Sequence, residues 1–531
     1  MSVTPTVSYP GVYIQEVPSG VRTITGVATS ITAFIGRALR GTPDEPETIN
    51  SFADFERIFG GLCVGSSMSY AVRDFYLNGG KQAIIVRLYH KDAEPSTATL
   101  TADTLTPGAA LTLEAASPGS WGRQLRARVD HNTRPLDPGE APDSLFNLTI
   151  RDGVTGQVEE FRNLSITEDH PRQVDKVLLN ESKLARMTGN LPPTRPLKSN
   201  EPSPGQDPWG DNTPATNYVA TEASDGSPLD KEDFVGSGKE TKKEGLYALQ
   251  KAGLFNLLCI PPHELGDDIE KDLVTAAAKY CEDRRAMFLV DPSQSWKNKE
   301  DAKKAIEPTN TVGTESANAA LFFPRLKMPN PQRDNQLEDF VPCGAVAGIF
   351  ARTDSARGVW KAPAGLDANL VGMPRLTVSL TDAENGELNP LGINCLRVMP
   401  AVGPVVWGSR TLKGNDRFGS QWKYIPVRRM ALHIEESLYR NTQWVVFEPN
   451  DEPLWAQIRL NIGAFMHNLF RQGAFQGKTP QEAYFVKCDK ETTTQDDINR
   501  GIVNILVGFA PLRPAEFVVI KISQMAGQIR T

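Results

Sequence analysis

One continuous stretch near the C-terminus, residues 444–524, sets the strongest constraint on how this chain folds. At its centre, apolar residues repeat at three- and four-residue steps, the spacing that places side chains on one face of an α-helix. Acidic cap candidates precede the repeat, Pro453 falls in the first turn, and Gly473 follows as a terminator. The pattern therefore predicts an amphipathic helix over 454–472. Its apolar positions are Leu454, Trp455, Ile458, Ile462, Phe465, Met466, Leu469 and Phe470.

The opposite face of this helix is polar and mildly basic, and two predicted strands follow the helix. The stretches 502–509 and 517–522 are short and apolar, and Pro511 and Pro514 separate them. Because few residues follow the second stretch, we expect it to pair either within its own chain or with another chain. The polar face carries Gln457, Arg459, Asn461, His467, Asn468 and Arg471.

Length, charge and apolar runs narrow the class of protein. A chain of 531 residues predicts several domains, and a net charge of -7 disfavours a nucleic-acid binder, which normally has a basic surplus. No apolar run approaches the roughly 20 residues that span a bilayer. The first residues, MSVTPTVSYPG, lack the regions of a signal peptide. We therefore expect synthesis and folding in a cytoplasm, without membrane insertion.

Two stretches of alternating strands and helices, separated by a long interval, predict a discontinuous α/β core. Residues 95–240 between them contain several strand-like stretches, so we expect an inserted β-rich domain. Its last part, 191–240, is poor in apolar residues and is predicted to be a surface loop. The core elements are expected at 31–39, 83–89, 254–260 and 286–290 for strands and at 52–59, 68–78 and 273–284 for helices. The strands of the insertion are expected at 111–113, 124–129, 145–150 and 157–161.

Four further patterns carry structural expectations. Residues 320–328 (ALFFPRLKM) are strand-like, and the small-residue run 342–350 suits close helix packing. Arg428 and Arg429 are expected to cap a helix or to pair with acidic partners. Near the N-terminus, residues 12–15 alternate as an isolated strand between turn-forming residues, with enough chain to reach a neighbouring subunit.

Two short stretches resemble phosphate-binding and metal-binding motifs, but neither has the residues that such a motif needs. Residues 236–239 (GSGK) resemble part of a phosphate loop, but Asp233 stands where a glycine is needed and Glu240 where Ser or Thr is needed. A linker is the better interpretation. Cys259 and His263 are four residues apart, but Pro261-Pro262 between them favours a rigid turn over a metal site. The six cysteines are scattered singly, which predicts reduced, buried thiols.

Acid–base candidates also have simpler structural explanations. His467 has no nucleophile in a recognisable motif beside it, so we expect a solvated or interface histidine. Glu448, Asp451 and Glu452 suggest calcium or a carboxylate pair, but capping and compensation of the helix dipole are sufficient. No catalytic residue, metal or cofactor is therefore assigned.

The chain resembles the tail sheath protein family of contractile phage tails and related contractile injection systems. The resemblance covers both ends and most of the C-terminal half, in the family's order, and is weakest in the insertion. It is carried by YPGVYIQE (9–16), FNLLCIPP (255–262), FPRLKMPNP (323–331), CGAVAGIFARTDSARGVWKAPAG (343–365), LNPLGINCLR (388–397), WGSRTL (407–412), WKYIPVRR (422–429) and the stretch 444–524.

The resemblance implies a structural and mechanical role rather than an enzyme. It implies six-membered rings stacked around an inner tube, with terminal arms that add strands to neighbouring subunits. The implied partners are other copies, the inner tube protein, and baseplate and terminator or cap proteins, without nucleic acid. The implied inter-subunit strands are Val12, Tyr13, Ile14, Gln15 and Glu16, and Glu516, Phe517, Val518, Val519, Ile520, Lys521 and Ile522. The implied tube-facing residues are Gln457, Arg459, Asn468, Arg471 and Lys478.

Two alternatives remain open. One is a terminator or cap ring of the same particle; the other, a nucleotide-dependent α/β enzyme, lacks the glycine-rich loop it needs.

The expected fold is α/β (α+β) with several domains. These are an N-terminal arm (1–25), two parts of an α/β domain (26–95 and 241–345), an inserted β-rich outer domain (96–240) and a C-terminal core domain (346–531) that contains the helix 454–472 and an arm (515–531).

Overall fold

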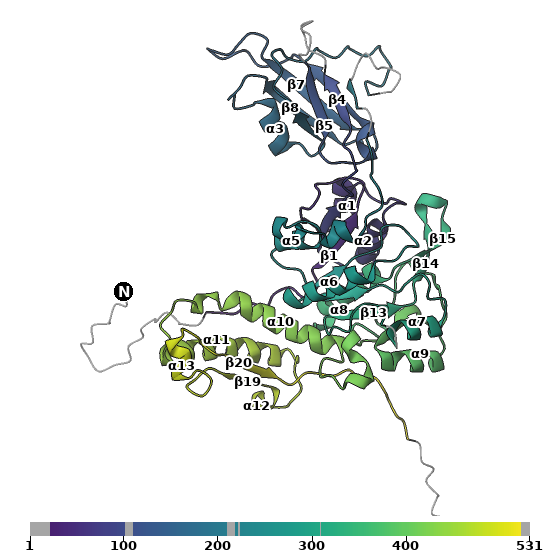
Figure 1. Ribbon diagram of the computed structural model, residues 1–531, viewed down its shortest axis with the longest axis vertical. Helices are drawn as coiled ribbons and strands as arrows, with labels where there is room; N and C mark the ends of the chain where they lie inside the picture. The colour runs from purple at the N-terminus through teal and green to yellow at the C-terminus, as the bar shows by residue number, and fades with distance from the viewer. Residues whose placement is uncertain (1–21, 101–109, 210–217, 221–222, 308–309, 522–531) are drawn as a thin grey trace, which may run out of the picture. The chain divides into compact units, whose positions relative to one another are not determined.

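The computed structural model describes residues 22–100, 110–209, 218–220, 223–307 and 310–521, which belong to two compact units (Figure 1). The sheet unit comprises residues 30–353 and 363–423, and the terminal unit comprises residues 1–29, 354–362 and 424–531. Helices and several separate sheets occur together, which confirms the predicted α/β (α+β) class. Among the described helices, none combines the length and the apolar character needed to cross a membrane.

An eight-stranded sheet forms the centre of the sheet unit. Its order is β18-β17-β13-β12-β11-β1-β3-β2, and β1 pairs in parallel with both β3 and β11. Strands from both sides of the long insertion are therefore neighbours, as the discontinuous core predicts. The bounds are β1 Thr32–Arg37, β2 Glu47–Ile49, β3 Ala83–Leu88, β11 Leu257–Cys259, β12 Met287–Val290, β13 Ala319–Phe323, β17 Ile393–Met399 and β18 Gly403–Val406.

Both faces of the central strands are buried. Every residue of β3 and β12 is buried, which explains why these strands are continuous apolar runs rather than alternating patterns. A large core of aliphatic and aromatic side chains surrounds them. The main helices of this unit are α1 Phe52–Phe59, α2 Ser67–Leu77, α6 Lys271–Asp283, α7 Lys299–Ile306, α8 Cys343–Arg357 and α9 Asp382–Leu388.

Glycines bring α8 directly against the backbone of α2. A Cβ atom added to Gly344 would lie 2.0 Å from the carbonyl oxygen of Ala71, and one added to Gly348 would lie 2.5 Å from that of Phe75. These separations are far shorter than van der Waals contact. The small-residue run at 342–350 thus forms a closely packed helix, as predicted.

The inserted domain contains two small sheets that share one apolar core. One has the order β10-β6-β7-β8 and the other β4-β5-β9. The turn around Asp152 and Gly153 joins β7 to β8, and the strands expected in this region are present. The bounds are β4 Thr97–Leu100, β5 Leu111–Ala115, β6 Leu125–Asp130, β7 Leu145–Asp152, β8 Val158–Ser165, α3 Val174–Glu181, β9 Ala185–Thr188 and β10 Tyr218–Val219.

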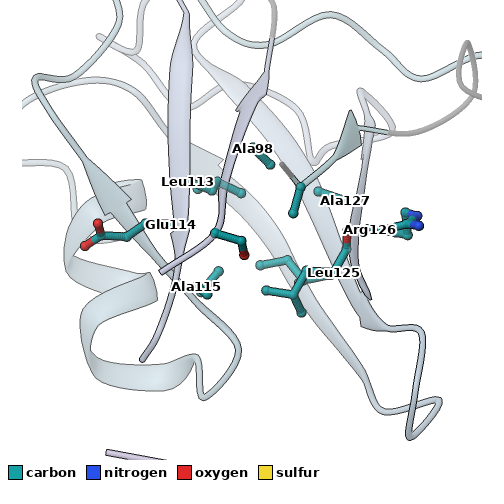
Figure 2. Close-up of a pocket in the computed structure, with 11 residues that line it drawn as sticks. Ala98, Leu113, Glu114, Ala115, Leu125, Arg126 and Ala127 are labelled. Carbon is teal, nitrogen blue, oxygen red and sulfur yellow. Dashed lines mark hydrogen bonds between the residues drawn. The ribbon is translucent and has the colours of Figure 1, made fainter. Parts of the chain in front are cut away.

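A small apolar cavity of about 20 Å³ lies inside this domain (Figure 2). Leu113, Leu125 and Ala127 line it, while the charged ends of Glu114 and Arg126 point away from it (Figure 2). The volume accommodates about one water molecule. The cavity is therefore a packing defect and is too small for a ligand.

The expectation of one strand-like stretch at 320–328 was wrong in detail. Residues 320–328 form two strands in different sheets: β13 ends at Phe323, and β14 Leu326–Asn330 pairs with β15 Gln336–Phe340 and β16 Arg375–Leu376. The proline between the two strands supplies no amide hydrogen to a sheet, so the chain leaves the first sheet there. The sequence pattern alone does not show that change of sheet.

The polar stretch 191–240 is not loop throughout. Its end folds into α4 Lys231–Val235 and α5 Lys239–Lys242. The carboxylate of Asp230 caps α4, and Phe234 enters the main core. A single buried phenyl ring and a capping box thus fix this part, although its composition is that of a loop.

Candidate assembly surface

The long helix predicted at 454–472 is α11 Glu452–Arg471 of the terminal unit. Asp451 is its N-cap and accepts a hydrogen bond from the amide of Leu454 (3.4 Å). Asn450 accepts a second bond, from the indole N–H of Trp455 (2.9 Å). Asp451 therefore acts in capping, as expected. Gly473 follows in the left-handed conformation (φ +78°).

The apolar face of α11 is buried, and one polar residue of the helix is buried with it. Leu454, Trp455 and the later apolar positions pack in the core of the terminal unit. Asn461, predicted on the polar face, is also buried, and its side-chain oxygen accepts a hydrogen bond from the amide of Arg22 (3.0 Å). That assignment was wrong, because the N-terminal segment covers this part of the helix.

The predicted tube-facing residues do not share one environment. Gln457, Asn468 and Arg471 are exposed on α11, and Lys478 is exposed beyond the helix. Arg459 is only half-exposed: its guanidinium pairs with Glu452 (2.5 Å) and donates to the carbonyl of Cys488. Arg459 therefore contributes to the fold of its own unit, whereas the other four present polar groups to solvent.

A two-stranded sheet packs beside α11. It consists of β19 Tyr484–Lys487 and β20 Leu506–Phe509, paired antiparallel from Tyr484↔Phe509 to Lys487↔Leu506. The sequence stretch 502–509 predicted β20, but β19 was missed. Its signal is the alternation of half-buried Tyr484 and Val486 with exposed Phe485 and Lys487. A two-stranded sheet is marginal alone, and in the described residues both outer edges lack a strand partner.

The C-terminal segment is exposed and apolar. The hydroxyl of Tyr424, at the start of α10 Ile425–Asn441, donates to the carboxylate of Glu516 (3.1 Å). After that contact, Phe517 to Ile520 are 75–80% exposed, and residues 516–521 form no strand within the described part of the chain. Ile522 and the predicted strand residues Val12 to Glu16 lie outside the described residues.

The segment 22–29 lies along α10, from its C-terminal end towards its N-terminal end. Thr25 exchanges hydrogen bonds with the side chain of Asn441 (3.5 and 3.1 Å), and the amide of Val27 donates to Ser437 (3.1 Å). Gly26 lies against His433, where an added Cβ would be 3.2 Å from the ring. Burial lowers the pKa of His433 to about 4, so this ring stays neutral and packs as an apolar group.

A buried ion pair ends this segment. Arg429 and Asp354 are each 4% exposed and lie 2.6 Å apart. Thr29 joins both: its hydroxyl donates to Asp354 (2.7 Å), and its carbonyl accepts from Arg429 (2.8 Å). The expectation that Arg428 and Arg429 pair with acidic residues is confirmed, since Arg428 contacts Glu435 (3.2 Å).

The remaining chemical candidates have structural roles. The Nδ1 atom of His263 accepts from the amide of Leu229 (3.1 Å), and its Nε2 lies 3.3 Å from the guanidinium of Arg37. In the described residues, no group of three or more His, Cys, Asp or Glu side chains is arranged to hold a metal. The six cysteines are free; five are buried as predicted, and Cys63 is half-buried.

Family models identify the chain. The phage tail sheath protein central domain matches residues 239–412, and the phage tail sheath C-terminal domain matches residues 419–524, together more than half of the chain. The chain belongs to the phage tail sheath protein family. This is a family of structural sheath proteins of phage tails, not of enzymes.

Individual relatives agree with this assignment. The tail sheath proteins of Vibrio phage KVP40 and Enterobacteria phage T4 are 26% and 23% identical over 188 and 189 residues. Each match covers 35% of this chain but only 27% of the relative's length. The chain thus matches about a quarter of these longer proteins.

Solved sheath structures share the fold over nearly the whole chain. The anti-feeding prophage helical sheath in its contracted state is 24% identical, with a TM-score of 0.56 over 98% of this chain and 100% of the other. The sheath tail protein of Listeria innocua is 14% identical, with a TM-score of 0.59 over 92% and 96% of the two chains. The sheath fold therefore includes the inserted domain as well as the two matched regions.

Proposed function

We propose that this sheath protein polymerises as stacked six-membered rings around an inner tube and contracts to drive that tube through a target envelope. The observation that carries the proposal is the exposed apolar segment 517–520 together with the open edges of the β19–β20 sheet. An apolar strand without a partner and a sheet with unpaired edges complement each other. The structural neighbours include a contracted helical sheath and a six-fold symmetrised baseplate assembly.

Strand exchange suits a moving assembly. In the proposal, Val12 to Glu16 and Glu516 to Ile522 add strands to neighbouring copies, so adhesion is spread over many backbone hydrogen bonds. Subunits can then reorient while their arms remain paired. Contraction needs no nucleotide, because the extended state is metastable and new contacts between subunits replace weaker contacts with the tube.

Removing either arm tests the proposal. We expect chains lacking residues 1–20 or 515–531 to remain folded but to form no tubes, since each loses its exchanged strand. Negative-stain electron microscopy, with circular dichroism as the check on folding, measures both properties. Normal tubes from either truncated chain would refute the arm assignment. Single rings from the full chain would favour a terminator or cap instead.

A point variant sharpens this test. Val519→Pro removes one backbone N–H from the C-terminal strand and should impair tube formation. Val519→Ile keeps that donor and an apolar side chain, so it serves as the matched control. Residue 519 is 79% exposed in the single chain, and neither change should lower the melting temperature. Equal assembly of the two variants would contradict strand addition through this segment.

The polar face of α11 is proposed to contact the tube. Arg471→Glu should weaken binding of the sheath to the tube while polymerisation without the tube continues, because Arg471 is exposed on that face. Co-sedimentation with the purified tube protein measures this binding. Arg162→Glu, 77% exposed in the inserted domain, is the control for charge alone. Arg459→Glu is a poorer probe, because it also breaks contacts inside its own unit.

The proposal also defines partners and place. Besides other copies and the tube, the sheath would meet a baseplate at one end and a terminator or cap at the other. Assembly in the bacterial cytoplasm follows if the particle is completed before release. Neither nucleic acid nor direct membrane insertion is needed for this role. Fractionation of producing cells before lysis would locate the assembled tubes.

A further inference from the structure

The turn between α10 and α11 carries an exposed apolar knob, Val446 and Phe447. Phe447 is fully exposed (103% of its reference area), and Val446 is 57% exposed. The backbone of Phe447 is also left-handed (φ +69°), which is unusual for a bulky residue. Both features are unfavourable in a single chain. Strain and exposure at one aromatic residue together indicate a contact made outside the chain.

The surroundings of the knob are acidic. Glu448 follows it directly and Asp451 caps α11; both are exposed, while the nearby Glu452 is paired with Arg459. A suitable partner is therefore an apolar segment with positive charge beside it. The exposed C-terminal segment has this composition: Phe517 to Ile520 are apolar and Lys521 follows them.

The segment cannot cover the knob of its own chain. Glu516 is held at the start of α10 by the hydroxyl of Tyr424, whereas Phe447 follows the other end of that helix. The 17 residues of α10 separate these points by about 25 Å at 1.5 Å per residue. From Glu516 to Ile520 an extended chain reaches at most about 14 Å. The described part of the segment leaves the unit at one end of α10 (Figure 1).

We propose that the knob formed by Val446 and Phe447 of one copy receives the apolar segment 517–521 of a second copy. Phe447 packs against the alternating side chains of that segment, and Glu448 faces Lys521. The inference rests on the proposed exchange of the C-terminal arm and adds a side-chain contact to the proposed strand pairing. In this contact the aromatic ring is an anchor of the kind that dominates interface energies.

Cross-linking between two differently marked chains tests the contact. Full-length chains carrying Phe447→Cys and Val519→Cys are mixed, allowed to assemble, and treated with a short bismaleimide. We expect a heterodimer band joining the two marked chains. Val154→Cys, 68% exposed in the inserted domain, replaces Phe447→Cys in the control and should give none. The same mixtures are viewed by electron microscopy.

The outcomes separate this inference from the proposed function. Tubes without the 447–519 product, or with Phe447→Cys joined to the tube protein, overturn the knob assignment while the sheath role stands. Failure of the unmarked full-length chain to form any polymer counts against the sheath role itself. The heterodimer in tubes, absent from the Val154→Cys control, supports the contact.

A second variant distinguishes an interface role from a structural one. Phe447→Asn keeps a residue that tolerates the left-handed backbone and removes the exposed ring. We expect its melting temperature to be unchanged or higher, and its critical concentration for assembly to rise roughly tenfold. Val154→Asn, which removes another exposed apolar side chain, should leave assembly unchanged. A lower melting temperature with normal assembly would overturn the proposal.

Discussion

Asp354→Ala is expected to lower the free energy of unfolding of the terminal unit by about 3–5 kcal/mol, because it leaves the buried Arg429 without its counter-charge. Both partners are 4% exposed, so water does not replace the lost carboxylate. The hydroxyl of Thr29 loses its acceptor in the same step. Calorimetry should show the melting transition of this unit at a markedly lower temperature.

Two controls define the cause of that loss. The double variant Asp354→Leu with Arg429→Met removes both charges and should recover most of the stability, since an apolar pair needs no counter-ion. Asp283→Ala breaks the exposed pair with Lys279, whose side chains are 60% and 66% exposed, and should change little. A small effect of Asp354→Ala alone would mean that water reaches Arg429 in the folded protein.

Gly344→Ala is expected to destabilise the sheet unit by about 3 kcal/mol, at the upper end of the usual range for overpacking. The new methyl group would lie 2.0 Å from the carbonyl oxygen of Ala71, so α8 and α2 must move apart. The backbone of α2 cannot move aside in the way that the end of a flexible side chain can. Denaturant unfolding followed by circular dichroism measures the loss.

The matched control is a glycine in another helix of the same unit. Gly386 lies in α9, and nothing lies within 4 Å of a Cβ added there. Gly386→Ala should therefore stabilise the protein by about 0.5–1 kcal/mol through higher helix propensity. Equal effects of the two substitutions would show that close helix contact is not the reason for Gly344.

The sequence predicts local structure well where one physical rule dominates. The cap at Asp451, the apolar stripe of α11 and the small-residue run of α8 each reflect one local requirement, and the structure has all three. Sequence patterns mispredict burial and secondary structure where contacts with distant segments of the chain determine them. Asn461 looks like a surface residue until Arg22, 439 positions away, covers it. Likewise, the ring of Phe234 fixes a helix in a stretch whose composition predicts a loop.

The candidate assembly surface also combines features that the sequence predicts with features that depend on tertiary contacts. Apolar residues 517–520 could be predicted to seek a partner from composition alone, and their exposure in the single chain agrees with that. The role of Arg459 could not be predicted from the sequence, because its contact with the carbonyl of Cys488 depends on how β19 packs beside α11. Neither the left-handed backbone of Phe447 nor its full exposure has a signal in the sequence.

The anchoring of residues 22–29 along α10 has a mechanical consequence. Bonds from Asn441, Ser437 and Arg429 follow one another along the axis of α10, and Asn461 of α11 adds a bond to Arg22. A force that pulls on Arg22 along this axis loads these bonds in shear, so they must break together. A force at right angles to the axis would unzip them one at a time. The segment thus resists a force along this axis and detaches more easily under a force at right angles to it.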